Sequence, residues 1–151
     1  MLAGSMEHET LDDMMQDYAE KAVELARDFD VQLDFSEASV QALERILAQL
    51  HDEHLAFTVG RSSPEQAVEE QMVMMCKLWG GYLGEVVRRR FGGEWSIEKY
   101  PAGDFLIVTL NVNGARLFPS MKVHKRLTEG SSENIWTFYQ SVRAKLEAKV
   151  Q

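Results

Sequence analysis

Residues 63–100, SPEQAVEEQMVMMCKLWGGYLGEVVRRRFGGEWSIEKY, decide the fold of this chain. Ser63 can cap a helix, and Pro64 suits the first helical position because its missing N–H would have no partner there. Apolar residues then recur every three or four positions, as on one face of a helix. They are Val68, Met72, Met75, Trp79, Tyr82 and Val86. A second apolar stripe lies beside this one, so the sequence predicts a central helix that other elements surround.

Gly80, Gly81 and Gly84 fall inside this predicted helix, where a glycine costs about 1 kcal/mol relative to alanine. Gly80 and Gly84 are one turn apart on the same face, so we expect another backbone to pack closely against that face. A phosphate-binding glycine loop is the alternative, but it needs a strand directly before the glycines and a helix that starts at them. The position of these glycines within a helix argues against a nucleotide site.

After the central helix the pattern changes from a helical to an extended period. Residues 95–100 alternate like a strand, and residues 105–112 are rich in β-branched and aromatic side chains. Asn113-Gly114 is a strong hairpin signal, because both central positions of a type I′ turn need a positive φ. With a return strand over residues 115–118, the sequence predicts a three-stranded antiparallel meander.

Two helices precede the central one, over residues 11–29 and, capped by Ser36, over residues 36–50. A short helix over residues 120–127 and a final helix capped by Ser132 follow the strands. The predicted fold class is α+β: three N-terminal helices, a three-stranded antiparallel β-meander, a short helix and a C-terminal helix packed on the sheet. The central and C-terminal helices are the expected cover of the sheet, because three strands are unlikely to be stable without one.

No linker divides the chain, so we expect a single domain over residues 6–151, with residues 1–5 (MLAGS) as a remnant of cloning. The composition, 45% hydrophobic and 26% charged, is ordinary for a globular protein. The N-terminus has no leader pattern, no run is long enough to span a membrane, and the one cysteine cannot form an internal disulfide. These features predict a cytoplasmic protein without a membrane partner.

Several short motifs resemble those of a family of small, uncharacterised bacterial α+β domains. They are GxYxGE at residues 80–85, GGxW at 92–95, KRL at 125–127 and FY at 138–139. The resemblance extends over residues 70–140. It implies a bacterial origin and one fold unit, but the family carries no activity that could be transferred to this chain.

The net charge of −8 is unevenly distributed along the chain. Residues 1–70 contain 17 acidic and 4 basic side chains, whereas residues 71–151 contain 7 acidic and 12 basic ones. One interpretation is that the two halves form acidic and basic faces of one domain, whose fields partly offset each other. The other is that the basic face binds an anionic partner or the acidic face binds a basic one.

Six basic residues form the candidate anion- or partner-binding site: Arg88, Arg89, Arg90, Lys122, Lys125 and Arg126. Consecutive arginines point in different directions, and Glu85 precedes Arg88 and Arg89 by three and four positions, so local ion pairs also explain the triplet. If all six bordered the sheet, they could bind a phosphate or a carboxylate. Nucleic acid is not the expected partner, since Trp95 and Tyr100 form no aromatic ladder and the chain is acidic overall.

Other residues with chemical potential have simpler structural explanations. Cys76 lies on the apolar helix without a neighbouring histidine to activate it. His51 and His54 are three positions apart, but a zincin site needs histidines four apart and a third ligand. The aromatic residues have the spacing of core side chains: Trp79, Tyr82, Trp95, Trp136, Phe138 and Tyr139. We therefore expect no metal site and no cofactor.

The sequence contains no recognisable serine nucleophile motif, pair of catalytic carboxylates or redox cysteine pair. The leading hypothesis is a non-enzymatic protein-binding domain, immunity- or chaperone-like, whose partner is another protein. Two alternatives stay open. One is an anion- or nucleic-acid-binding module that uses the six cations, and the other is an enzyme whose site is assembled from residues distant in sequence. The sequence also leaves a homo-oligomer open.

Overall fold

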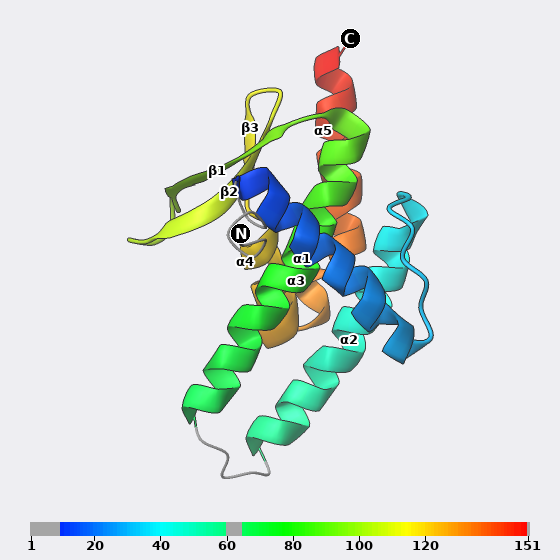
Figure 1. Cartoon of the computed structure of the whole chain (residues 1–151), viewed down its shortest axis with the longest axis vertical. Coiled ribbons are helices and arrows are strands. Elements are labelled where there is room, and N and C mark those ends of the chain that lie inside the picture. Colours follow the sequence, from blue (N-terminus) through cyan, green and yellow to red (C-terminus); the bar gives the residue numbers. More distant parts are fainter. Residues whose placement is uncertain (1–9, 60–64, 151) are drawn as a thin grey trace, which may run out of the picture.

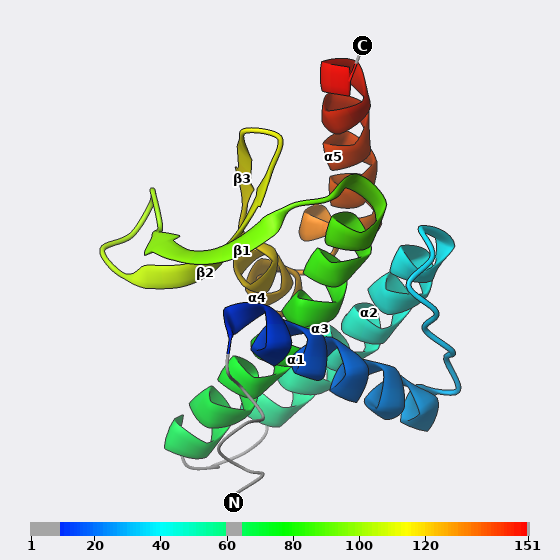
Figure 2. The ribbon, with the colours of Figure 1, turned by 45° about the horizontal axis from the view of Figure 1, so that its top comes forward.

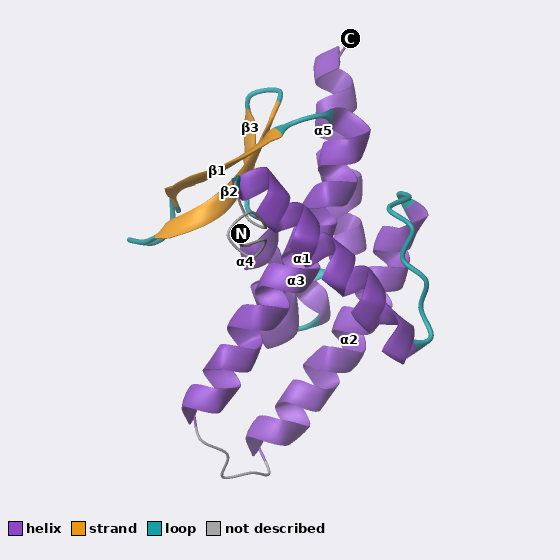
Figure 3. Ribbon diagram, in the orientation of Figure 1, coloured by secondary structure: helices purple, strands orange, loops and turns teal. Residues whose placement is uncertain are grey.

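The computed structural model describes residues 10–59 and 65–150, and it has the α+β architecture that the sequence predicts (Figures 1 and 3). The N-terminal elements are helical: α1 (Leu11–Ala26), the 3-10 turn η2 (Arg27–Phe29), α2 (Ala38–Val59) and α3 (Glu65–Phe91). A sheet follows, made of β1 (Glu94–Lys99), β2 (Leu106–Val112) and β3 (Ala115–Leu117). The last elements are again helical: α4 (Pro119–Glu129), the 3-10 turn η3 (Ser131–Glu133) and α5 (Ile135–Val150).

Side-chain caps define where the second helix begins. The Oγ of Ser36 accepts a hydrogen bond from the backbone N–H of Ser39 at 3.2 Å. This contact confirms Ser36 as the cap, because it satisfies an N–H that the first helical turn leaves unpaired. Ser63 and Pro64, which are predicted to begin α3, lie outside the described residues, as do residues 1–5.

The prediction that Ser132 caps the last helix is wrong. Ser132 lies in η3, and Asn134 is the cap, because its Oδ1 accepts a 3.0 Å hydrogen bond from the third backbone N–H of α5. Asparagine and serine are about equally good caps, so the choice depends on tertiary contacts. Ile135 is fully buried and its N–H donates to the carboxylate of Glu44 at 3.0 Å, which fixes the start of the helix.

The α3 helix lies at the centre of the structure, as predicted. Every residue from Leu78 to Val87 is buried, because α1 and α4 pack on this part of the helix and β2 contacts it as well. Figure 1 shows α1 crossing over α3. The apolar stripes therefore correspond to a helix that is covered on several sides.

Each of the three glycines in α3 faces a different neighbour. A Cβ at Gly80 would lie 2.7 Å from the Cα of Ser120, at the start of α4, and a Cβ at Gly81 would contact α1. A Cβ at Gly84 would collide with the indole ring of Trp95. Close approach of another backbone is therefore confirmed for Gly80, whereas the main neighbour of Gly84 is an aromatic side chain.

The sheet is antiparallel and has the strand order β1-β2-β3. β1 pairs with β2 along its whole length, whereas β3 pairs only with Leu110, Asn111 and Val112. Asn113 and Gly114, between β2 and β3, have φ angles of 49° and 85°. Two consecutive positive φ angles are what a type I′ turn requires, so the predicted hairpin is confirmed.

The β1–β2 hairpin extends beyond the helices that cover the sheet (Figures 1 and 2). This cover comes from α1, α3 and α4, so the prediction holds for the central helix. The C-terminal helix α5 is not part of the cover as predicted, because it packs chiefly on α2 and α4. Trp95 and Leu110 are buried on the covered face, but Ile97 and Leu106, farther along the same face, are 57% and 71% exposed. The helical cover therefore ends before the sheet does.

Gly80→Ala tests the close packing of α3 on α4. We expect the free energy of unfolding to fall by about 1–3 kcal/mol, because the new Cβ has to displace the backbone of Ser120. The higher helix propensity of alanine offsets only about 1 kcal/mol of this loss. Urea unfolding followed by circular dichroism measures the change, and an unchanged or raised stability would contradict the packing argument.

Candidate functional site

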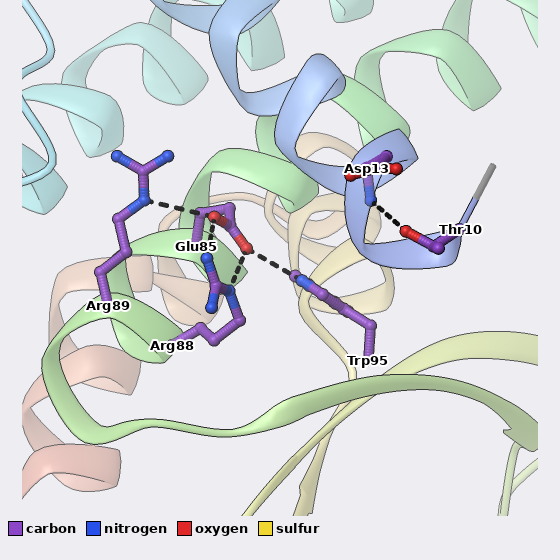
Figure 4. A network of polar contacts seen from close by, with 6 residues as sticks. All are labelled: Thr10, Asp13, Glu85, Arg88, Arg89 and Trp95. Atoms are coloured by element: carbon purple, nitrogen blue, oxygen red, sulfur yellow. Dashed lines mark hydrogen bonds and ion pairs between the residues drawn. The ribbon is translucent and has the colours of Figure 1, made fainter. Parts of the chain in front are cut away.

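The basic residues predicted to bind an anion have carboxylate partners within the protein in most cases. Arg88 and Arg89 both bind Glu85, with Nε–carboxylate distances of 2.6 Å and 3.2 Å (Figure 4). The local ion pairs predicted from the spacing are therefore confirmed. Both arginines therefore bind the same carboxylate, and this carboxylate belongs to the protein itself.

Glu85 is fully buried, and its carboxylate also accepts a hydrogen bond from the indole N–H of Trp95 at 2.9 Å (Figure 4). Burial by itself would raise the pKa of this carboxyl group. The hydrogen bonds from Arg88, Trp95 and Arg89 outweigh that effect and hold the pKa of Glu85 below its ordinary value. Glu85 is therefore a charged structural group that joins the end of α3 to β1.

Arg90 and Arg126 pair with the acidic N-terminal half of the chain. Arg90 lies 3.2 Å from Glu37, and the buried Arg126 lies 2.8 Å from Glu44 on α2. Both carboxylates are far from these arginines in sequence. The contacts favour the interpretation that the acidic and basic halves form one domain and partly offset each other's charge.

The two lysines of the predicted site, Lys122 and Lys125, line a small pocket of about 150 Å³ together with Arg116. We call it the basic pocket, and its aromatic walls are Tyr100, Phe118 and Phe138. Lys122 binds Glu133 at 2.7 Å and Arg116 binds Glu98 at 2.9 Å. Lys125 is half-buried, and its side chain forms no direct ion pair with another described residue, although its charge interacts with the carboxylate of Glu133. The other five cations of the predicted set each form a direct ion pair with a carboxylate.

A larger groove, which shares Met121 with the basic pocket, lies between α3, β2 and α4. It encloses about 660 Å³, a volume typical of ligand-binding pockets. We call it the apolar groove. Its main apolar lining is Met72, Val73 and Cys76 on α3, Leu106 and Val108 on β2, and Met121 on α4.

Large apolar side chains at this groove are exposed to solvent. Leu106 is 71% exposed and Val73 is 53% exposed, and Met74, which is next to Val73 in sequence but does not line the groove, is also exposed. Single exposed apolar residues are ordinary, but a group of them around a concave apolar surface indicates an interaction site. The cause lies in the fold: the hairpin extends past its helical cover, and the N-terminal half of α3 stays open on that side.

The one cysteine of the chain, Cys76, lines the apolar groove but is not an activated nucleophile. Burial raises the pKa of the Cys76 thiol to about 12, so the thiol stays protonated and is a poor nucleophile. His51, whose Nδ1 forms a 2.7 Å hydrogen bond with the backbone carbonyl of Leu127, does not line the groove, whereas His54 and His124 do. Across residues 10–59 and 65–150, no group of three or more His, Cys, Asp or Glu side chains is arranged to hold a metal ion.

The sequence analysis does not predict the apolar groove. The sequence does contain one indication of an apolar surface, since the four consecutive residues from Met72 to Met75 are apolar. Val73 and Met74 lie outside the predicted stripes, so the predicted core does not account for them. Leu106 falls within a predicted strand, and a strand pattern does not say where the helical cover ends. The groove therefore becomes visible only when α3, β2 and α4 are assembled.

No protein-family model, curated protein or solved structure matches this chain. The resemblance to a bacterial domain family, the bacterial origin and the cytoplasmic location therefore stay predictions. Among the described residues, no helix combines the length and the hydrophobicity that crossing a membrane requires.

Glu85→Gln tests the buried carboxylate. We expect the free energy of unfolding at neutral pH to fall by roughly 3–5 kcal/mol, because two arginines lose the charge that they surround. Glu98→Gln is the matched control and should have a much smaller effect, since Glu98 pairs with Arg116 at the surface. Urea unfolding of the three proteins measures the difference, and equal losses in both variants would contradict the structural role of Glu85.

The effect of Glu85→Gln should also depend on pH. Because the native pKa of Glu85 is lowered, its contribution to stability is fully present above the ordinary glutamate pKa of 4.5 and is lost as pH falls through the native pKa. The stability difference between the wild type and Glu85→Gln should therefore shrink in acid. A difference that stays constant from neutral pH to well below 4.5 would show that the charge is not the source of the effect.

Proposed function

We propose that this chain is a non-enzymatic protein-binding domain whose apolar groove takes up an apolar segment of a partner protein. The observation that carries the proposal is the exposure of Leu106 and Val73 in a concave apolar lining. Covering such side chains is favourable by roughly 1.5–3 kcal/mol for each one that becomes fully buried. A few of them can therefore offset the entropy that two proteins lose when they associate.

The distribution of charge around the groove supports a protein partner. The exposed side chains of Glu69 and Lys77 accompany the apolar lining. An apolar centre with polar surroundings is the anatomy of protein interfaces. As part of the same proposal we place the domain in a bacterial cytoplasm, in an immunity- or chaperone-like role, because masking a segment of another protein needs no catalytic residue.

Anion binding at the basic pocket is the second candidate function. Lys125 has no ion pair within the described part of the chain, whereas Lys122 and Arg116 are already bound to carboxylates. A pocket of about 150 Å³ suits one carboxylate or phosphate group. The pocket is too small to hold a stretch of nucleic-acid backbone, and Lys122 and Arg116 are already paired. Binding of a nucleic acid depends on several free cations.

Selection of displayed random peptides on the immobilised full-length chain tests the proposal without knowledge of the natural partner. We expect apolar peptides that bind the wild type and fail to bind Val73→Asp, which places a charge in the apolar groove. Leu25→Asp is the matched control, because Leu25 is an exposed apolar residue that does not line the groove. Affinities of the synthesised peptides, measured by fluorescence anisotropy, should be at least about tenfold weaker for Val73→Asp alone.

A selection that yields no binding peptide would overturn the proposal, and so would peptides that bind Val73→Asp as well as the wild type. Circular dichroism of each variant shows whether the fold is intact. Val73 is already half exposed, so the charged side chain can reach solvent and the fold should persist.

A further inference from the structure

The strand β2 is paired on both sides only at its C-terminal end. β3 contacts residues 110–112, and after Leu117 the chain leaves the sheet to begin α4. Residues 106–109 therefore pair with β1 on one side and, within the described part of the chain, with no strand on the other. We call this free side of residues 106–109 the open edge.

The backbone groups that face the open edge follow from the register. Leu110 and Val112 pair with β3 across a two-residue turn, so their N–H and C=O groups point toward β3. Backbone groups alternate in direction along a strand, so Leu106 and Val108 point to the same side. The hydrogen bond from the N–H of Tyr100 to the C=O of Phe105 agrees with this alternation, because it places Phe105 toward β1.

The open edge borders the apolar groove. Leu106, Ile107 and Val108 line the groove together with residues of α3 and α4. A strand added at this edge would gain backbone hydrogen bonds from Leu106 and Val108. Its alternate side chains would enter the groove, which is how peptides that extend a sheet obtain both affinity and specificity.

The charges near the open edge select the chemistry of the added strand. Met121 lines both the apolar groove and the basic pocket, so the two cavities adjoin. The basic pocket contains Phe118, which follows β3, and Tyr100, which pairs with Phe105 just before β2. It also holds Lys125, whose charge interacts with Glu133 but which forms no direct ion pair with a described residue. A carboxylate on the added strand would complement Lys125.

We propose that an extended segment of the partner pairs as an additional strand with the open edge of β2, places apolar side chains in the apolar groove and binds Lys125 with an aspartate or glutamate. This inference rests on the proposed function, since it names the binding mode at the same groove.

Leu106→Pro tests strand addition directly. The proline removes an N–H that faces the open edge, and it breaks no hydrogen bond to β1. Leu106 is also the first residue of β2, a position at which proline is tolerated. Binding of the selected peptides should weaken by about tenfold or more, because the ring also blocks the approach of a backbone. Ile97→Pro is the matched control, since Ile97 is an exposed residue whose backbone faces the outer edge of β1.

Lys125→Glu tests the acidic contact. Peptides with Asp or Glu beside the apolar residues should bind this variant about tenfold more weakly than the wild type, and the loss should shrink as salt is raised. Lys145→Glu is the matched control, because Lys145 is exposed on α5 and does not line the basic pocket. Amide hydrogen exchange of the wild type adds a readout without mutation: Leu106 and Val108 should become protected when peptide binds.

The outcomes separate the two proposals. If no peptide binds, or if binding is insensitive to Val73→Asp, the proposed function fails. If binding needs Val73 but survives Leu106→Pro without protection of the Leu106 and Val108 amides, a protein segment binds the groove and strand addition is wrong. If Lys125→Glu leaves the affinity of acidic peptides unchanged, the acidic contact is wrong.

Discussion

A carboxylate in a protein interior is tolerated only when donors satisfy its oxygens, and Glu85 accepts hydrogen bonds from Arg88, Arg89 and Trp95. The arginines come from the same helix, whereas the indole comes from β1. The bond to Trp95 therefore holds the first strand against the end of α3, and the indole ring lies over Gly84, where any side chain would collide with it. One pair of residues, Gly84-Glu85, determines where the sheet lies on the helices.

The exposed end of the β1–β2 hairpin and the open edge of β2 follow from the contact between Glu85 and Trp95 and from the approach of α4 to α3. Because β1 is held at Trp95, near its start, the rest of the hairpin continues beyond the helical cover and leaves Leu106 exposed. β3 is short because the chain turns at Pro119 into α4, whose Ser120 backbone packs on Gly80. The glycines of α3 thus permit the two contacts that create the apolar groove and leave part of β2 without a second neighbour.

The features that were predicted correctly are encoded by nearby residues. The stripes of α3, the Asn113-Gly114 turn and the pairing of Glu85 with the next helical turn all depend on spacings of a few residues. The contact between Arg126 and Glu44 joins residues far apart in the chain, and single-sequence patterns do not specify such pairs. The same holds for the apolar groove, which three elements form together, and for the start of α5, which depends on the burial of Ile135.

An unpaired strand edge with apolar side chains favours aggregation, and proteins usually shorten such edges, charge them or cover them. The edge of β1 is longer, but it carries charged residues such as Lys99 and Glu98. The open edge of β2 is short and borders a groove between α3 and α4. The helices α3 and α4 beside the groove hinder the approach of the flat edge of another sheet, but they leave room for a single extended segment. The geometry that limits aggregation therefore also favours the kind of partner that we propose for this site.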